Sequence, residues 1–179
     1  MSRDDVQLLA ERLLQPLGNR WIHTKSVAAQ ASALVKAVPP HDQGLLVAAA
    51  WCHDLGYAPE LATTGFHPLD GARFLTKVGY PTRLCQLVAH HSAATFEAHE
   101  RGLSAELAEW EDEKSAVTDA LWMADMTTGP QGQRLDYPTR LAEVLDRYGV
   151  DSPVGVAMRR AREEIEGAIT RTRRRLTAT

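Results

Sequence analysis

Residues 45–54 read LLVAAAWCHD, an apolar stretch that ends in two polar side chains, His53 and Asp54. Its leucines and alanines favour a helix. A helix that is apolar on nearly all sides has no face to turn to water, so it is usually buried in the centre of a bundle. This stretch therefore requires other helices around it. Gly56 follows the His-Asp pair and allows the chain to turn there.

The composition agrees with one helical domain. The chain has 179 residues, of which 44% are hydrophobic and 24% charged, ordinary proportions for a soluble globular protein with one sizeable core. Runs of β-branched residues are absent, whereas alanine and leucine are abundant. The sequence contains no stretch that indicates a strand, a repeat or a second domain. We therefore expect an all-α bundle that forms a single domain over residues 1–179.

Helical periodicity, with proline and glycine as stop and start signals, divides the chain into segments. We expect helices over about residues 4–16, 21–38, 45–54, 68–78, 82–91, 115–125, 137–148 and 153–176. The segment 92–114 is the least regular and is strongly acidic. One interpretation is a solvated loop or short helix. The other is a lid over a functional site, because long loops in compact domains are often functional.

Charge and hydropathy exclude several classes of protein. The net charge of -3 argues against general nucleic-acid binding. No apolar run approaches the roughly 20 residues that cross a bilayer, and the first residues, MSRDD, lack the pattern of a signal peptide. The cysteines, Cys52 and Cys85, do not indicate a disulfide framework. We expect a cytoplasmic protein that binds neither membranes nor nucleic acid.

Five histidines and two aspartates lie at or just beyond the ends of the expected helices. Bundles build metal sites from ligands that different helices contribute one or two at a time. Imidazole together with carboxylate suits Fe, Mn, Zn or Ni. Seven groups exceed the needs of one ion, so we expect two ions bridged by Asp54; one ion with supporting histidines is the alternative. The candidate ligands are His23, His53, Asp54, His67, His90, His91 and Asp125.

Four of these residues, in the order H…HD…D, resemble the signature of the HD superfamily of metal-dependent phosphohydrolases. His23 lies in RWIHTKSV, His53-Asp54 follows the apolar stretch, and Asp125 ends LWMAD. The motif HPxxGA at His67 and the pair His90-His91 look like the subset that carries two irons or similar metals.

The resemblance implies an HD-type helical bundle with its metal-site core over about residues 20–140 and C-terminal helices over about 137–176. It implies two divalent metal ions, iron first, with manganese, nickel, zinc or magnesium as alternatives. By this likeness one ion takes His23, His53, Asp54 and Asp125. The other takes Asp54, His67, His90 and His91.

Two departures from the superfamily pattern affect the expected substrate. Many relatives carry a lysine after His-Asp-x-Gly, where this chain has Tyr57. The branch that acts on cyclic dinucleotides has Gly-Tyr-Pro after its paired histidines, where this chain has Ser92 and two alanines. Small cytoplasmic HD hydrolases of dinucleoside polyphosphates are closer in size and ligand set.

We therefore expect a phosphohydrolase that cleaves a small phosphoester or nucleotide with a metal-bound hydroxide. Asp54 would hold both metals, and Lys25 and Arg134 would contact the phosphate because each follows an expected ligand in the sequence. One alternative is a mixed-valent di-iron oxygenase that uses O₂ to cleave a carbon–phosphorus or carbon–carbon bond. Another is a non-enzymatic regulator that binds a nucleotide, although a full ligand set argues against it.

Overall fold

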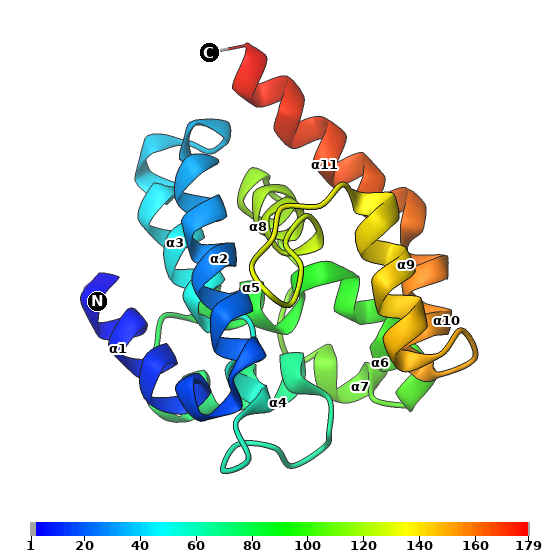
Figure 1. Ribbon diagram of the computed structural model, residues 1–179. Coiled ribbons are helices and arrows are strands. Elements are labelled where there is room, and N and C mark those ends of the chain that lie inside the picture. Colours follow the sequence, from blue (N-terminus) through cyan, green and yellow to red (C-terminus); the bar gives the residue numbers. More distant parts are fainter. Residues whose placement is uncertain (1–2, 179) are drawn as a thin grey trace.

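The computed structural model describes residues 3–178, and this part of the chain is all-α, as predicted (Figure 1). The helices are α1 (Arg3–Leu14), α2 (Asn19–Ala33), α3 (Gln43–Cys52), α4 (His67–Lys77), α5 (Thr82–Ala89), α6 (Ala94–Arg101), α7 (Ser104–Leu107), α8 (Ala116–Met126), α9 (Tyr137–Tyr148), α10 (Pro153–Arg160) and α11 (Arg162–Thr177). None of these helices combines the length and apolar character that a membrane span needs. Residues 1, 2 and 179, which the expected domain included, lie outside the described part.

The observed helices differ from the sequence prediction in two places. The last predicted helix is divided at Ala161 into α10 and α11. Periodicity could not reveal this break, because the apolar stripe of Met158, Ala161 and Ile165 continues across it. The segment 92–114 is largely helical, since it contains α6 and α7. Its first residues line the cleft described below.

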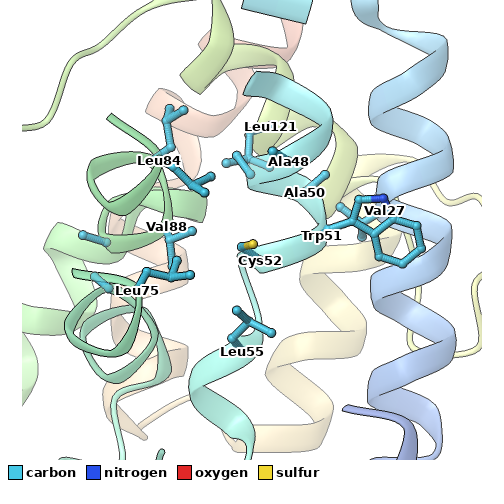
Figure 2. Packing of buried hydrophobic residues seen from close by; sticks show 14 of the residues in the cluster. Val27, Ala48, Ala50, Trp51, Cys52, Leu55, Leu75, Leu84, Val88 and Leu121 are labelled. Atoms are coloured by element: carbon cyan, nitrogen blue, oxygen red, sulfur yellow. The ribbon is translucent and has the colours of Figure 1, made fainter. Parts of the chain in front are cut away.

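Helix α3 lies in the core of the bundle, as its composition predicted. Every residue from Leu46 to Cys52 is buried. The helix packs against α1, α2, α5 and α8. Figure 2 shows Cys52 at the end of α3 and Leu55 just beyond it, with Leu75 and Val88 on the opposite side. The burial of α3 therefore fixes the position at which the chain leaves it, and this position is the His-Asp pair.

A second apolar cluster lies beyond α8. Helices α9, α10 and α11 contribute Leu141, Met158 and Ile165 to it, and α8 contributes Trp122 and Met126. The other face of α8 belongs to the first cluster. Figure 1 shows α8 between the N-terminal helices, blue to cyan, and the C-terminal helices, yellow to red. The bundle thus has two packing clusters that share α8.

Two glycines bring the turn after α3 into close contact with the start of α4. Gly56 lies in a short 3-10 helix, η4 (Leu55–Tyr57). A Cβ atom on Gly56 would lie 2.0 Å from the carbonyl oxygen of His67 and 2.7 Å from the amide nitrogen of Gly71. Both neighbours are backbone atoms, so they cannot move aside cheaply. This contact sets the distance between Asp54, just before η4, and His67, the first residue of α4.

We expect Gly56→Ala to destabilise the protein by about 1–3 kcal/mol or more, because the added methyl group forces two backbone segments apart. Gly44→Ala is the matched control. Gly44 is an exposed residue of α3 with open space around it, so alanine there should stabilise the helix by about 0.5–1 kcal/mol. Urea unfolding followed by circular dichroism measures both changes. Equal stability of the two variants would show that the close contact is not required.

Candidate metal centre

The bundle brings six of the seven predicted ligands together from five segments of the chain. His23 lies in α2, and Asp125 lies in the last turn of α8. The other four occupy helix boundaries, where the chain direction changes. His53 and Asp54 directly follow α3, His67 begins α4, and His91 begins the 3-10 helix η5 (His91–Ala93) after α5. Asp54, His23, His53 and His91 are almost fully buried, and Asp125 is buried to a similar extent.

The first group of donors is centred on one oxygen of Asp54. His53 Nε2 lies 3.3 Å from Asp54 Oδ2, and His23 Nε2 lies 3.9 Å from the same oxygen. Asp125 Oδ1 lies 2.9 Å from His23 Nε2 and 4.0 Å from His53 Nε2. Nitrogen and oxygen donors at such separations can converge on a single ion.

The second group faces the other oxygen of Asp54. His67 Nε2 lies 3.5 Å from Asp54 Oδ1 and 3.0 Å from His91 Nε2. The ligand atoms of these three residues all lie within 4.8 Å of one another, as do those of His23, His53 and Asp54. The two oxygens of Asp54 therefore point toward two separate donor groups, and this is the arrangement that a bridging carboxylate requires.

Backbone carbonyls fix the orientation of three imidazole rings, and the first is His23, whose Nδ1 lies 3.2 Å from the carbonyl oxygen of Gly129. His53 Nδ1 lies 2.8 Å from the carbonyl oxygen of Ala50, and His91 Nδ1 lies 2.7 Å from that of Val88. A proton on Nδ1 donated to the carbonyl leaves Nε2 free to accept, the usual arrangement around metal-binding histidines. His53 Nε2 is buried and has no hydrogen-bond partner among the described residues. This nitrogen therefore faces the cluster without a partner in the described part of the chain, and a metal ion that bound there would displace its proton.

The carboxylates of the cluster are held in their ionised form. Burial tends to raise the pKa of Asp54, but the positive charge of Arg20 and the neighbouring His53 hold it well below its ordinary value. Burial likewise tends to raise the pKa of Asp125, but a hydrogen bond from His23 and the charges of His53 and Arg140 lower it well below the usual range. Ionised carboxylates are the form that binds metal cations.

The histidines of the two groups differ in basicity. Burial opposes protonation of His53, yet the charge of Asp54 outweighs it and raises the pKa of His53 to about 9. Burial and the nearby His53 lower the pKa of His91 to about 4. Burial and the adjacent His91 also lower the pKa of His67 well below its ordinary value. The two histidines of the second group are thus neutral and ready to coordinate near pH 7.

His90, predicted as a ligand of the second metal, does not join the cluster. Its Nε2 lies 2.7 Å from the carbonyl oxygen of Trp110, and its Nδ1 lies 3.4 Å from the hydroxyl of Thr95. Consecutive residues at the end of a helix point in different directions, so only one of a His-His pair can face the cluster. The structure corrects the prediction: His91 faces the donor groups, and His90 links α5 to the segment after α7.

Lys25 and Arg134, predicted to contact phosphate, lie elsewhere as well. Lys25 is exposed, with its ammonium nitrogen 5.2 Å from the ring centre of Trp21. Residues two apart on a helix do not share a face, so Lys25 points away from the side that carries His23. Arg134 is exposed, and its backbone pairs with Thr128. Neither residue is among the described residues that line the cleft at the cluster.

Arginines that the sequence prediction missed occupy this cleft instead. Arg20 Nη1 donates to Asp54 Oδ2 at 2.8 Å. Its guanidinium carbon lies 3.8 Å from the ring centre of Tyr57, which in turn stacks on His67 at 4.0 Å with 20° between the ring planes. Arg20 precedes His23 by three residues on α2, and this spacing places both on one face. The helical spacing could therefore have identified Arg20.

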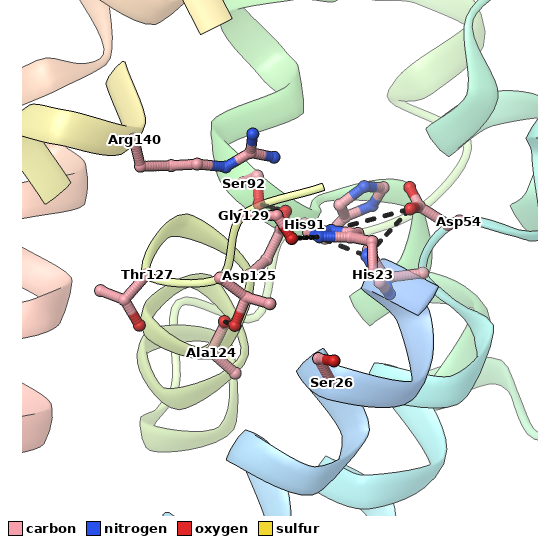
Figure 3. A network of polar contacts seen from close by, with 12 residues as sticks. His23, Ser26, Asp54, His91, Ser92, Ala124, Asp125, Thr127, Gly129 and Arg140 are labelled. Carbon is pink, nitrogen blue, oxygen red and sulfur yellow. Dashed lines mark hydrogen bonds and ion pairs between the residues drawn. The ribbon is translucent and has the colours of Figure 1, made fainter. Parts of the chain in front are cut away.

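A strained turn holds Asp125 in place. Ser92 and Ala93 both have left-handed backbone conformations, with φ of 48° and 59°. For residues other than glycine such conformations cost about 1–3 kcal/mol each, and they persist only where surrounding contacts fix them. Ser92 Oγ donates a hydrogen bond to Asp125 Oδ2, leaving Oδ1 facing the histidines. The turn thus orients one carboxylate of the cluster, which Figure 3 shows beside Ser92 and His91.

A cleft of about 560 Å³, including the part open to solvent, gives access to the cluster. It lies where the two apolar clusters meet. At its base are Asp54, His67, His91, Ser92 and Asp125. Its cationic side carries Arg20, Arg140 and Arg147, and its apolar side includes Val144, Val154 and Met158. A small molecule with an anionic group and an apolar part fits this division.

Comparison with known protein families identifies the class of protein. The sequence model of the HD domain matches residues 20–151, well over half of the chain, so the chain belongs to the HD domain family. This assignment confirms the family expected from the H…HD…D residues, and the fold is that of an HD domain. Searches of curated proteins and of solved structures gave no match. HD domains bind divalent metals, and the two donor groups described above are placed to hold them.

We expect His90→Ala to keep its full metal content and His67→Ala to lose one ion per chain. The imidazole of His67 faces Asp54 and His91, whereas that of His90 contacts backbone and hydroxyl oxygens. His90→Ala should still destabilise the fold by about 1–3 kcal/mol, because it leaves the carbonyl of Trp110 without its donor. Elemental analysis of protein purified without oxygen measures the metal content. Loss of an ion from His90→Ala would return His90 to the ligand set.

Proposed function

We propose that this HD domain protein is a metal-dependent phosphohydrolase that acts on a small phosphoester or nucleotide. HD domains belong to a superfamily of metal-dependent phosphohydrolases. The observation that carries the proposal is the position of Asp54 between two donor groups at the base of an arginine-lined cleft. A phosphohydrolase needs both features. Metal ions held by the donor groups would activate water, and the arginines would neutralise the charge of the phosphate.

The donor set fits two divalent ions. One would take His23, His53, Asp54 and Asp125, and the other would take Asp54, His67 and His91. The buried, unpartnered Nε2 of His53 supports this fit. Imidazole with carboxylate suits iron, manganese, zinc or nickel, and we propose iron as the resident metal. Bound ions of this kind lower the pKa of water and neutralise charge that develops on a phosphoryl group.

The chain's own residues would orient the substrate and stabilise its charge. The hydrogen bond to Asp54 holds the guanidinium of Arg20 at the wall of the cleft. A phosphate bound in the cleft would therefore lie within reach of this group. Guanidinium groups bind phosphate through two parallel hydrogen bonds, which gives both energy and orientation. The apolar side formed by Val144, Val154 and Met158 would cover the organic part of the substrate and exclude water around it.

One argument for the oxygenase alternative is Tyr57, which stands where many relatives carry a phosphate-binding lysine. In the structure the guanidinium of Arg20 lies over the ring of Tyr57. A positive charge is therefore present beside this position although the lysine is absent. This observation removes one argument for the oxygenase, namely the absence of a positive charge at this position.

The deciding experiment starts from protein purified without oxygen. Its metals are quantified, and phosphate release is then measured over a panel of phosphomonoesters, phosphodiesters and nucleotides. Phosphate release that requires the metal supports the proposal. Two irons per chain with oxygen consumption and no phosphate release would support the oxygenase instead.

We expect Arg20→Ala to lower kcat/KM for the best phosphoester by about tenfold to a hundredfold. A charge-assisted hydrogen bond contributes about 1.5–3 kcal/mol, which corresponds to that range. Lys25→Ala is the matched control. It also removes a cation from α2, but Lys25 is exposed and its ammonium group lies over the ring of Trp21. Steady-state kinetics, with metal content measured in parallel, compares the two. Wild-type kcat/KM in Arg20→Ala would exclude this role.

A further inference from the structure

Two arginines of α9 share one carboxylate. Arg140 Nη1 donates to Glu143 Oε2, and Arg147 Nη2 donates to the same oxygen at 2.7 Å. The third arginine of the cleft, Arg20, is paired with Asp54. Within the described part of the chain, the ion pairs of Arg140 and Arg147 both go to Glu143. The pair of guanidiniums therefore carries one positive charge that Glu143 does not balance.

Arg140 is the more unusual of the two because it is buried. Only 6% of its surface is exposed, and its Nε is a buried donor to which the structure assigns no acceptor among residues 3–178. A buried charged group that lacks part of its hydrogen bonding is costly, and such groups are rare in native proteins. Figure 3 shows its guanidinium extending from α9 toward Ser92 and Gly129, on the side of the metal-ligand cluster.

The surroundings of this guanidinium form a second hollow beside the main cleft. Arg20, Arg140 and Arg147 line both. The remaining lining of the hollow comes from Asn19, His23 and Pro130. The three arginines thus stand between the cleft and a smaller space, and one ligand of the first metal group forms part of its wall. An anion placed there would lie next to the reacting group of a bound substrate.

We propose that Arg140 and Arg147 form a binding site for a second phosphoryl group of the substrate, separate from the phosphorus that reacts. This inference rests on the proposed function and narrows the substrate class to compounds with at least two phosphoryl groups, such as nucleoside diphosphates or other diphosphate esters. A phosphoryl group in the hollow would balance the positive charge of Arg140 and Arg147 that the single carboxylate of Glu143 leaves unneutralised. The planar, bidentate geometry of guanidinium suits this ligand.

The test measures the binding of inorganic phosphate to the full-length protein after its metals have been removed, so that phosphate can no longer bind through them. Isothermal titration calorimetry should still detect binding in the wild-type protein. Arg140→Gln and Arg147→Gln should each weaken it by about tenfold or more. Arg134→Gln, an exposed arginine outside both hollows, should bind phosphate like the wild type.

Circular dichroism shows whether each variant is folded, and Arg147→Gln provides the decisive measurement if loss of the buried Arg140 unfolds the chain. Absence of phosphate binding in the folded, metal-free wild type would overturn the inference. Equal binding by the wild type and both cleft variants would overturn it as well. Metal-dependent phosphate release over the panel of phosphoesters and nucleotides tests the proposed function separately. The result of the calorimetry therefore does not depend on the result of the activity assay.

Discussion

The metal centre depends on the electrostatics of Asp54. This carboxylate is buried at the exact point where the apolar helix α3 ends, and burial alone would favour its neutral form. Arg20 and His53 keep it ionised, and its two oxygens then face two different donor groups. The other features of the site serve this residue. The burial of α3 fixes its position, and the contact of Gly56 with the start of α4 brings His67 to its second oxygen.

The cleft owes its mixed character to the meeting of two apolar clusters. The first cluster surrounds α3 and carries most of the metal-binding side chains on its edge. The second, formed by α9–α11, supplies the apolar side of the cleft together with Arg140 and Arg147. Helix α8 belongs to both and carries Asp125 at its end. Most of the candidate metal ligands and the apolar side of the cleft therefore come from different halves of the bundle and meet at one boundary.

The sequence predicted the features that depend on local pattern, namely the helices and most of the clustered residues. It did not predict the direction in which individual side chains point in the folded bundle. Hydrophobic periodicity located the helices, and the spacing of H…HD…D identified the residues that cluster. It could not separate His90 from His91, because which of two consecutive side chains faces the cluster depends on how the end of α5 packs in the bundle. Lys25 and Arg134 were chosen for closeness to ligands in the sequence, but Lys25 lies on another face of its helix. Arg140 reaches the cleft only through the packing of α9, which no short motif indicates.

The candidate metal ligands also connect metal supply to folding. The unfolded chain has no preformed site, so ions that bind His23, His53 and the two carboxylates bind almost only the folded bundle. By mass action, such a ligand adds about 2.7 kcal/mol to the free energy of unfolding when its free concentration is a hundred times its dissociation constant. With ions bound in this way, part of the stability of the bundle would be set by the cell's metal pool, and a shortage of metal would lower the amount of folded protein.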